Sequence, residues 1–199
     1  MKSALITGGT RGLGRALADE LRRRGWRVVV DARHEADVPG LVVGDVADPG
    51  HREALAAAGP FDLLVNNASV LGPGLSSLEK YPLDEFRHVY EVNTVAPLAL
   101  IQLIPADVVV NVSSDAAVEA YEGWGGYGSA KAALDHLTAV LAVEHPDRKL
   151  YSFDPGDMNT DLHQQAFPGE DISDRPEPES VVPRLIELIE SGRPSGRYT

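Results

Sequence analysis

The sequence contains no cysteine in its 199 residues, which excludes disulfide bonds and any thiolate that could act in catalysis or bind a metal. This absence is typical of proteins from reducing compartments, and we expect a cytoplasmic protein. Histidine is also sparse, since the six histidines are scattered and no pair has the spacing of metal ligands. The sequence therefore predicts no metal site.

Positive charge and long apolar runs are scarce as well. Eighteen Lys and Arg stand against thirty Asp and Glu, giving a net charge of −12, which disfavours a nucleic acid or an acidic membrane surface as partner. No stretch approaches the ~20 apolar residues of a membrane span. The apolar run at residues 3–7 leads directly into glycines and is too short for a secretion signal.

Strand-like and helix-like patterns alternate along the chain. Its hydrophobic fraction of 43% and its length are those of one ordinary globular domain, which we expect over residues 1–199. Strands are expected at residues 2–7, 26–30, 41–43, 61–65, 108–112, 150–153 and 195–199, and helices at 13–24, 50–58, 84–104, 127–145 and 180–191, with a break at Pro97. This alternation predicts a doubly wound parallel sheet of Rossmann type, an α/β fold with three layers in the order αβα.

Chemically useful side chains gather between residues 108 and 131. The run of β-branched residues at 108–112 ends in two hydroxyls, Ser113 and Ser114. After a glycine-rich loop, Tyr127 opens an Ala-rich helical segment in which Lys131 follows four residues later, on the same face. A phenol is a natural proton donor, and a nearby ammonium is expected to lower its pKa. Ser114 could stabilise charge on the oxygen that Tyr127 protonates, whereas the alternative is an exposed Tyr/Lys pair without a role.

The first predicted strand runs into three glycines, Gly8, Gly12 and Gly14, and a helix follows them. A diphosphate bound at a helix N-terminus needs close approach of backbone N–H groups, which a side chain would obstruct. The order strand, glycines, helix therefore predicts a dinucleotide-binding turn. A plain turn between strand and helix is the alternative.

Together, these motifs resemble the short-chain dehydrogenase/reductase family. The resemblance rests on the glycine spacing after Thr7 and on a strand, two serines, a thirteen-residue gap from Ser114 to Tyr127, and Lys131. It implies that Ser114 orients the substrate oxygen, that Tyr127 exchanges the proton, and that Lys131 binds the nicotinamide ribose and lowers the Tyr127 pKa. Asn93 matches the helix asparagine that holds this lysine through a water molecule in the family. The competing interpretation of Asn93 is a buried amide bonded to a backbone carbonyl.

The resemblance also implies a set of cofactor-binding residues. They are Gly8, Thr10, Arg11, Gly12, Leu13, Gly14, Arg33, Asp45, Val46, Asn67, Ala68, Tyr127, Lys131, Pro155, Gly156, Met158 and Thr160. Ser69 departs from the family pattern, which has glycine there. Arg33 follows Ala32, the usual position of a ribose-binding acid, and with Arg11 it favours a 2′-phosphate, so the prediction is NADP(H). Asp31 leaves NAD open.

The implied function is an oxidoreductase that transfers hydride between the nicotinamide and a small carbonyl compound or secondary alcohol. A dinucleotide-binding sensor without catalysis is the alternative, and an epimerase or dehydratase of nucleotide sugars would need a larger substrate domain. Residues 157–179 are expected to form a loop at the substrate mouth, with Tyr121 and Trp124 as walls. Eight acids against one arginine in residues 154–179 favour a neutral or cationic substrate, or mark only a solvated loop. A homodimer remains open.

Overall fold

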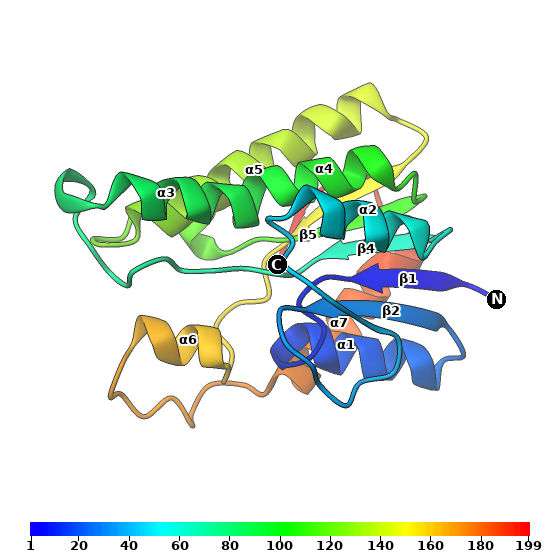
Figure 1. Cartoon of the computed structure of the whole chain (residues 1–199), viewed down its shortest axis with the longest axis horizontal. Coiled ribbons are helices and arrows are strands. Elements are labelled where there is room, and N and C mark those ends of the chain that lie inside the picture. Colours follow the sequence, from blue (N-terminus) through cyan, green and yellow to red (C-terminus); the bar gives the residue numbers. More distant parts are fainter.

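The computed structural model describes residues 1–199 and places every strand in one parallel sheet (Figure 1). The strands are β1 (Ser3–Ile6), β2 (Arg27–Ala32), β3 (Leu41–Val43), β4 (Leu63–Asn66), β5 (Val108–Val112), β6 (Lys149–Phe153) and β7 (Gly196–Tyr198). Their order in the sheet is β3-β2-β1-β4-β5-β6-β7, and each neighbouring pair is parallel. The predicted doubly wound sheet is confirmed.

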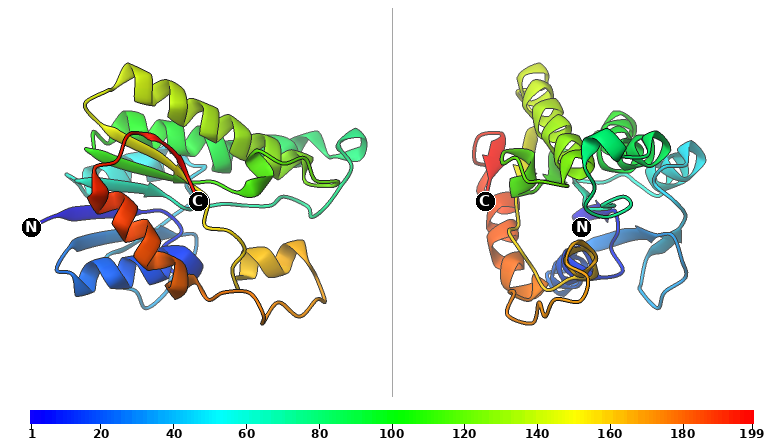
Figure 2. Two further views of the ribbon diagram at one scale, coloured as in Figure 1. Left: turned by 180° about the vertical axis from the view of Figure 1, so that it is seen from behind. Right: turned by 90° about the vertical axis from the view of Figure 1, so that its left-hand side faces the viewer.

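Helices cover both faces of this sheet (Figures 1 and 2). They are α1 (Gly12–Arg23), α2 (Pro49–Ala57), α3 (Leu83–Tyr90), α4 (Ala96–Leu103), α5 (Gly125–Glu144), α6 (Asp161–Ala166) and α7 (Pro178–Ser191). Adjacent strand residues point to opposite faces, so Ile6 packs with Leu17 of α1 and Leu185 of α7, whereas Leu5 packs with Leu55 of α2 and Leu100 of α4. Two hydrophobic cores thus enclose the sheet and fix the carboxyl ends of its strands.

The break predicted at Pro97 occurs earlier in the chain. A π-helical turn, η2 (Glu91–Val95), joins α3 to α4, and the Ala96 N–H bonds to the Glu91 carbonyl five residues back. Pro97 instead lies in the first turn of α4, where its missing N–H costs little. The predicted interruption is therefore confirmed, and it lies just before the proline, because the widened turn accommodates the hydrogen bond that Pro97 cannot donate.

Two other segments also differ from the sequence prediction. The region expected to be an irregular loop contains α6, whose first turn is capped by Thr160 accepting a hydrogen bond from the His163 N–H. Six helical residues are too few to show a period in the sequence. In addition, β2 extends to Ala32, so Asp31 lies within the strand and not after it.

The order of the strands positions the site. It reverses between β1 and β4, and in open α/β sheets such a reversal opens a crevice at the carboxyl ends of the strands. The glycine turn after β1, the loops after β4 and β5, and the segment after β6 all meet there. None of the helices is both long and apolar enough to cross a membrane.

Candidate active site

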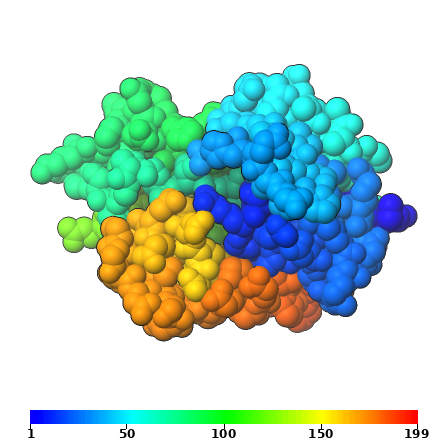
Figure 3. Space-filling view, turned by 60° about the horizontal axis from the view of Figure 1, so that its bottom comes forward, coloured from blue at the N-terminus to red at the C-terminus, as the bar shows by residue number.

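A cleft of about 1140 Å³ opens at the carboxyl edge of the sheet, larger than most small-molecule sites. In the space-filling view the surface is hollowed where the yellow α6 segment, the blue glycine turn and the green chain meet (Figure 3). Every residue predicted to bind cofactor or act in catalysis lines this cleft, except Gly14 and Asn93. The volume suits a dinucleotide with a small substrate beside it.

The glycine turn leaves the N-terminus of α1 free of side chains. Gly8 and Gly12 have φ values of +64° and +53°, which side-chain-bearing residues rarely adopt. No side chain caps α1, so the backbone N–H groups of its first turn remain available. A Cβ at Gly14 would lie 2.5 Å from both the Asn67 amide nitrogen and the Gly8 carbonyl oxygen. Gly14 therefore serves close packing behind the turn, and the turn fits a diphosphate.

Asp31 fixes the glycine turn through a hydrogen bond to its backbone. One oxygen of its buried carboxylate accepts the Gly8 N–H at 2.6 Å, and the other lies 3.1 Å from Nε2 of His51 in α2. Both carboxylate oxygens are thus engaged inside the protein. Asp31 lines the cleft but is buried and already bonds through both oxygens, whereas Arg33, which also lines the cleft, is exposed and better placed to meet a ligand.

Amide and hydroxyl groups join the end of β4 to the glycine turn. The Asn67 side chain donates to the carbonyls of Thr7 and Gly8, and the Thr7 hydroxyl accepts the backbone N–H groups of Asn67 and Ala68. In the loop after β3, Asp45 accepts the Ala47 N–H and so shapes its own turn. These bonds explain why the predicted residues converge although they come from different loops.

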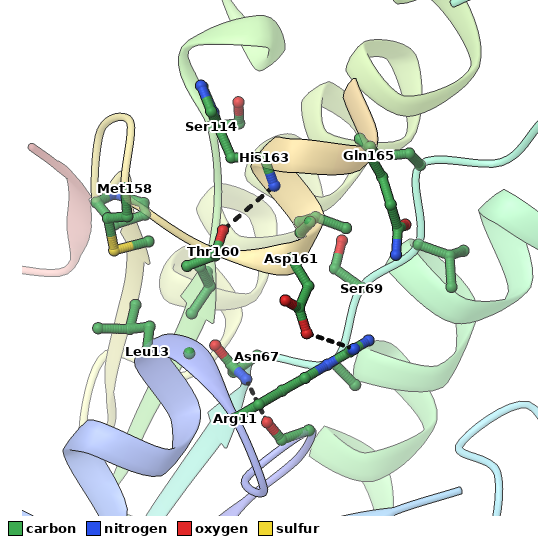
Figure 4. Close-up of a pocket in the computed structure, with 18 of the residues that line it drawn as sticks. Arg11, Leu13, Asn67, Ser69, Ser114, Met158, Thr160, Asp161, His163 and Gln165 are labelled. Atoms are coloured by element: carbon green, nitrogen blue, oxygen red, sulfur yellow. Dashed lines mark hydrogen bonds and ion pairs between the residues drawn. The ribbon is translucent and has the colours of Figure 1, made fainter. Parts of the chain in front are cut away.

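The mouth of the cleft is spanned by an ion pair. Arg11 of the glycine turn extends toward α6, where its guanidinium lies 2.8 Å from the Asp161 carboxylate (Figure 4). Both side chains are largely exposed, so the pair contributes little stability. Nothing in the sequence pattern predicted Asp161 as a partner of Arg11.

The three predicted catalytic side chains converge beside the glycine turn. Ser114 follows β5, and its hydroxyl donates to Asp115 at 3.0 Å and accepts the Ala116 N–H at 3.2 Å. Tyr127 and Lys131 lie one turn apart on α5 and are both buried. The Lys131 ammonium lies 5.6 Å from the centre of the Tyr127 ring and donates to the Val112 carbonyl at 2.8 Å.

Burial dominates the acid–base properties of this site. It raises the pKa of Tyr127 to about 12, although the hydroxyls of Ser114 and Ser69 act to lower it. Burial also lowers the pKa of Lys131 to about 8, with Asp135 opposing that change. The sequence interpretation expected a Tyr127 pKa below its ordinary value, but desolvation of the phenolate outweighs the neighbouring groups. The protein therefore keeps Tyr127 protonated at neutral pH, as a proton donor requires.

Asn93 is fully buried in the π-helical turn and does not reach the cleft. Its carboxamide oxygen accepts from the Val70 N–H and the Ser69 hydroxyl, and its NH₂ donates to the Val70 carbonyl. These bonds fasten the loop after β4 to the helices above it. The direct contacts of Asn93 are therefore those of a buried amide bonded to the backbone, which was the alternative to a contact with Lys131 through water.

Comparison with known proteins agrees with this geometry. The family model for short chain dehydrogenase matches residues 2–171. L-xylulose reductase from Bos taurus is 38% identical over 75% of this chain and 68% of its own length, and sepiapterin reductase from Mus musculus is 34% identical over 91% and 82%. A short chain dehydrogenase from Shigella flexneri, solved with NADP, superposes with a TM-score of 0.90 at 25% identity, covering 98% of this chain and 95% of its own.

The chain belongs to the short-chain dehydrogenase family. It is therefore an oxidoreductase that acts on CH–OH or C=O groups. In this short-chain dehydrogenase the cleft has an aromatic wall beside Tyr127. Trp124 stands edge-on to Tyr127 with ring centres 5.8 Å apart, and its ring centre lies 6.1 Å from that of Phe167.

Sequence reasoning predicted Trp124 as a wall but missed Leu71, Leu162 and Phe167, which pack in the same cluster. For Leu162 and Phe167, their isolated apolar character within the acidic 161–179 segment was the available signal, whereas Leu71 had none. Tyr121, the other predicted wall, lines the cleft but is half exposed and donates to Asp115.

Proposed function

We propose that the protein is an NADP(H)-dependent reductase of small carbonyl compounds, or the corresponding dehydrogenase of secondary alcohols. One observation carries this proposal: Ser114, Tyr127 and Lys131 line the same cleft as a glycine turn built for a diphosphate. The match of residues 2–171 to the family supports the same chemistry. The roles of individual residues follow from their surroundings.

A bound nicotinamide supplies the hydride that adds to the carbonyl carbon during reduction. Tyr127 transfers its phenolic proton to the carbonyl oxygen, so that carbon gains hydride, oxygen gains a proton, and C=O becomes CH–OH. The Ser114 hydroxyl turns from Asp115 and donates to the same oxygen, which stabilises the negative charge that develops there. Lys131, held by the Val112 carbonyl, places a positive charge behind the phenol and favours loss of its proton.

NADP(H) is the cofactor that the charges favour. Arg33 lines the cleft without a carboxylate partner, and Arg11 could exchange its exposed pairing with Asp161 for a 2′-phosphate, which pairs well with guanidinium groups. The only argument for NAD was Asp31, whose two oxygens bond to Gly8 and His51. NADP in the Shigella flexneri structure supports this choice.

The substrate class follows from the wall of the cleft. Trp124, Phe167 and Leu71 provide an apolar surface beside Tyr127, while carboxylates such as Asp115 and Asp157 line the rim. An apolar wall with an acidic rim accepts an uncharged carbonyl compound more readily than an anionic one. The reductases of xylulose and sepiapterin among the relatives support an uncharged substrate.

The Tyr127→Phe variant tests catalysis against the sensor alternative. The wild type should consume NADPH with members of a panel of uncharged ketones and aldehydes, and the variant should lose about 10²–10⁴-fold in kcat because its ring cannot donate a proton. NADPH binding, followed by its fluorescence, should remain within about 3-fold of the wild type. If the wild type consumes no NADPH with any panel member while both proteins bind it equally, the sensor function replaces the enzyme.

The remaining partner predictions concern assembly and location. Val140 and Val143 of α5 and Leu103 of α4 are exposed apolar side chains, which supports a homodimer through these helices. The cytoplasmic location stays a prediction from the absence of cysteine. Light scattering of the purified protein tests the dimer.

A further inference from the structure

Arg197 is an unusual side chain for the edge strand β7, because its guanidinium contacts three other segments at once. Its Nε lies 3.1 Å from the Asp135 carboxylate of α5. Its Nη2 lies 2.8 Å from the Asp154 carboxylate at the end of β6 and donates to the Ser114 carbonyl at 3.1 Å. Arg197 is 28% exposed, and its two acidic partners are 15% and 9% exposed, so these contacts are partly shielded from water.

The three contacted segments all carry parts of the active site. Ser114 belongs to the catalytic set, and its backbone carbonyl is the atom that Arg197 holds. Asp135 lies one helical turn beyond Lys131 on α5. Asp154 precedes the Pro155–Gly156 turn and accepts the Gly156 N–H at 3.0 Å. One guanidinium therefore links the serine, the helix that carries the lysine and the turn that borders the cofactor end of the cleft.

The same guanidinium compensates negative charge around the proton donor. The ionisable acids that act on this site are Asp115 after β5, Asp135 on α5 and Asp154 after β6. Asp154 and Asp115 raise the pKa of Tyr127, and Asp135 raises that of Lys131. Two of these three carboxylates are the ion-pair partners of Arg197. Without Arg197, the negative charges of Asp135 and Asp154 would face Lys131 and Tyr127 with no cation to offset them.

We propose that Arg197 is a positioning residue for the reaction, which holds Ser114, α5 and the turn after β6 in register and neutralises the two carboxylates behind them. This inference rests on the proposed reductase function. Arg197 does not line the cleft, so it acts through the residues it holds and not by touching cofactor or substrate. Its effect should therefore fall mainly on turnover and on ionisation, and much less on cofactor affinity, because many other segments also line the cofactor end of the cleft.

The test compares Arg197→Met, Arg197→Lys and the control Arg193→Gln. Arg193 comes from the same C-terminal segment and pairs with Glu187 at 2.6 Å, but it contacts no active-site segment. Using a carbonyl substrate that the wild type reduces, Arg197→Met should lose about 10–100-fold in kcat, since a small displacement of reacting groups has that effect. The Kd for NADPH should stay within about 3-fold. Arg197→Lys should recover part of the loss, and Arg193→Gln should match the wild type.

A second readout is independent of turnover. In protein carrying isotope-labelled lysine, NMR should show the titration of Lys131 moving to higher pH in Arg197→Met and remaining unchanged in Arg193→Gln, because Asp135 loses its cation only in the first. Unchanged kcat in Arg197→Met, or an unchanged Lys131 titration, overturns the proposal. If the wild type reduces no carbonyl at all, the proposed function fails, and the Lys131 titration alone still decides the role of Arg197.

Discussion

Lys131 shows how an active-site group can weaken the fold that holds it. Its ammonium is almost fully buried and has the Val112 carbonyl as its one hydrogen-bond partner. Burial lowers its pKa from the ordinary value of 10.5 to about 8, so at pH 7 the folded protein retains a charge that would be better hydrated in the unfolded chain. The proposed function requires the Lys131 amine, whereas the stability of the fold does not.

We therefore predict that Lys131→Met is more stable than the wild type at pH 7, by about 1–3 kcal/mol. The pKa of Lys131 is lower in the folded state than in the unfolded state. Between pH 8 and 10.5 the folded wild type therefore binds fewer protons than its unfolded chain, so its free energy of unfolding rises with pH through that window. The advantage of the variant should shrink accordingly. Urea unfolding at pH 7 and pH 9.5 measures both effects.

A matched control for this prediction is Lys80→Met, which removes an exposed lysine. Its stability should stay within about 0.5 kcal/mol of the wild type at both pH values. A Lys131→Met protein that is less stable than the wild type at pH 7 would contradict the argument, because it would mean that the bond to Val112 outweighs the cost of burial.

At the scale of residues, the sequence predicted which side chains meet but not all of their partners. Ser114, Tyr127 and Lys131 could be placed together because strand ends and helical spacing fix their positions. The role of Asp31 could not be predicted, since its bonds to Gly8 and His51 depend on how α2 packs beside β2. Arg197 was missed for the same reason, because its three partners are distant in sequence.

Among the elements, the π-helical turn η2 carries the largest difference from the sequence prediction. It places Asn93 where its carboxamide bonds to both backbone groups of Val70, and so it joins the helices α3 and α4 to the loop after β4. The sequence could predict an irregularity near Pro97 but not a widened turn before it. Whether a π-helical turn forms there depends on the buried hydrogen-bond partners of Asn93, and these partners come from a loop that is distant in the sequence.

We predict that Asn93→Ala lowers the free energy of unfolding by about 2–3 kcal/mol, because the N–H and C=O of Val70 lose their buried partner. The loop that carries Asn67 and Ala68 should loosen, so NADPH should also bind less tightly. Urea unfolding and fluorescence titration measure the two effects. Gln102→Ala, which removes an exposed amide from α4 away from the cleft, should change neither by a comparable amount. A stable Asn93→Ala protein would show that water replaces the carboxamide.

Across the whole molecule, the cleft collects segments from residue 8 to residue 179. A ligand that contacts so many separate segments stabilises the entire fold, by about 2.7 kcal/mol at a concentration of 100 times its Kd. For a protein of this size we predict that NADPH then raises Tm by about 5–10 °C. NADH at the same concentration should give a smaller shift, and Arg33→Ala should bring the two closer together. Equal shifts with NADPH and NADH in the wild type would contradict the proposed cofactor.

The parallel sheet and its three layers were predictable because alternating strand and helix patterns leave few topologies, whereas the order of the strands comes from the structure. The segment between β6 and α7 was the exception. Its short helix α6 depends on the Thr160 cap and on packing of His163 against Phe167, with ring centres 4.9 Å apart. Neither contact has a periodic signature in the sequence.

The parallel sheet has a consequence for how the chain reaches this structure. The central strand β1 pairs with β2 on one side and with β4 on the other, where Ala4 lies opposite Leu63. Every neighbouring strand pair except β2–β3 is bridged by a long crossover, so contacts between distant residues must form before the native structure gains stability, and such topologies fold slowly. On the ribosome, β1, α1 and β2 can dock early, but one side of β1 stays without its neighbour until residue 63 has emerged.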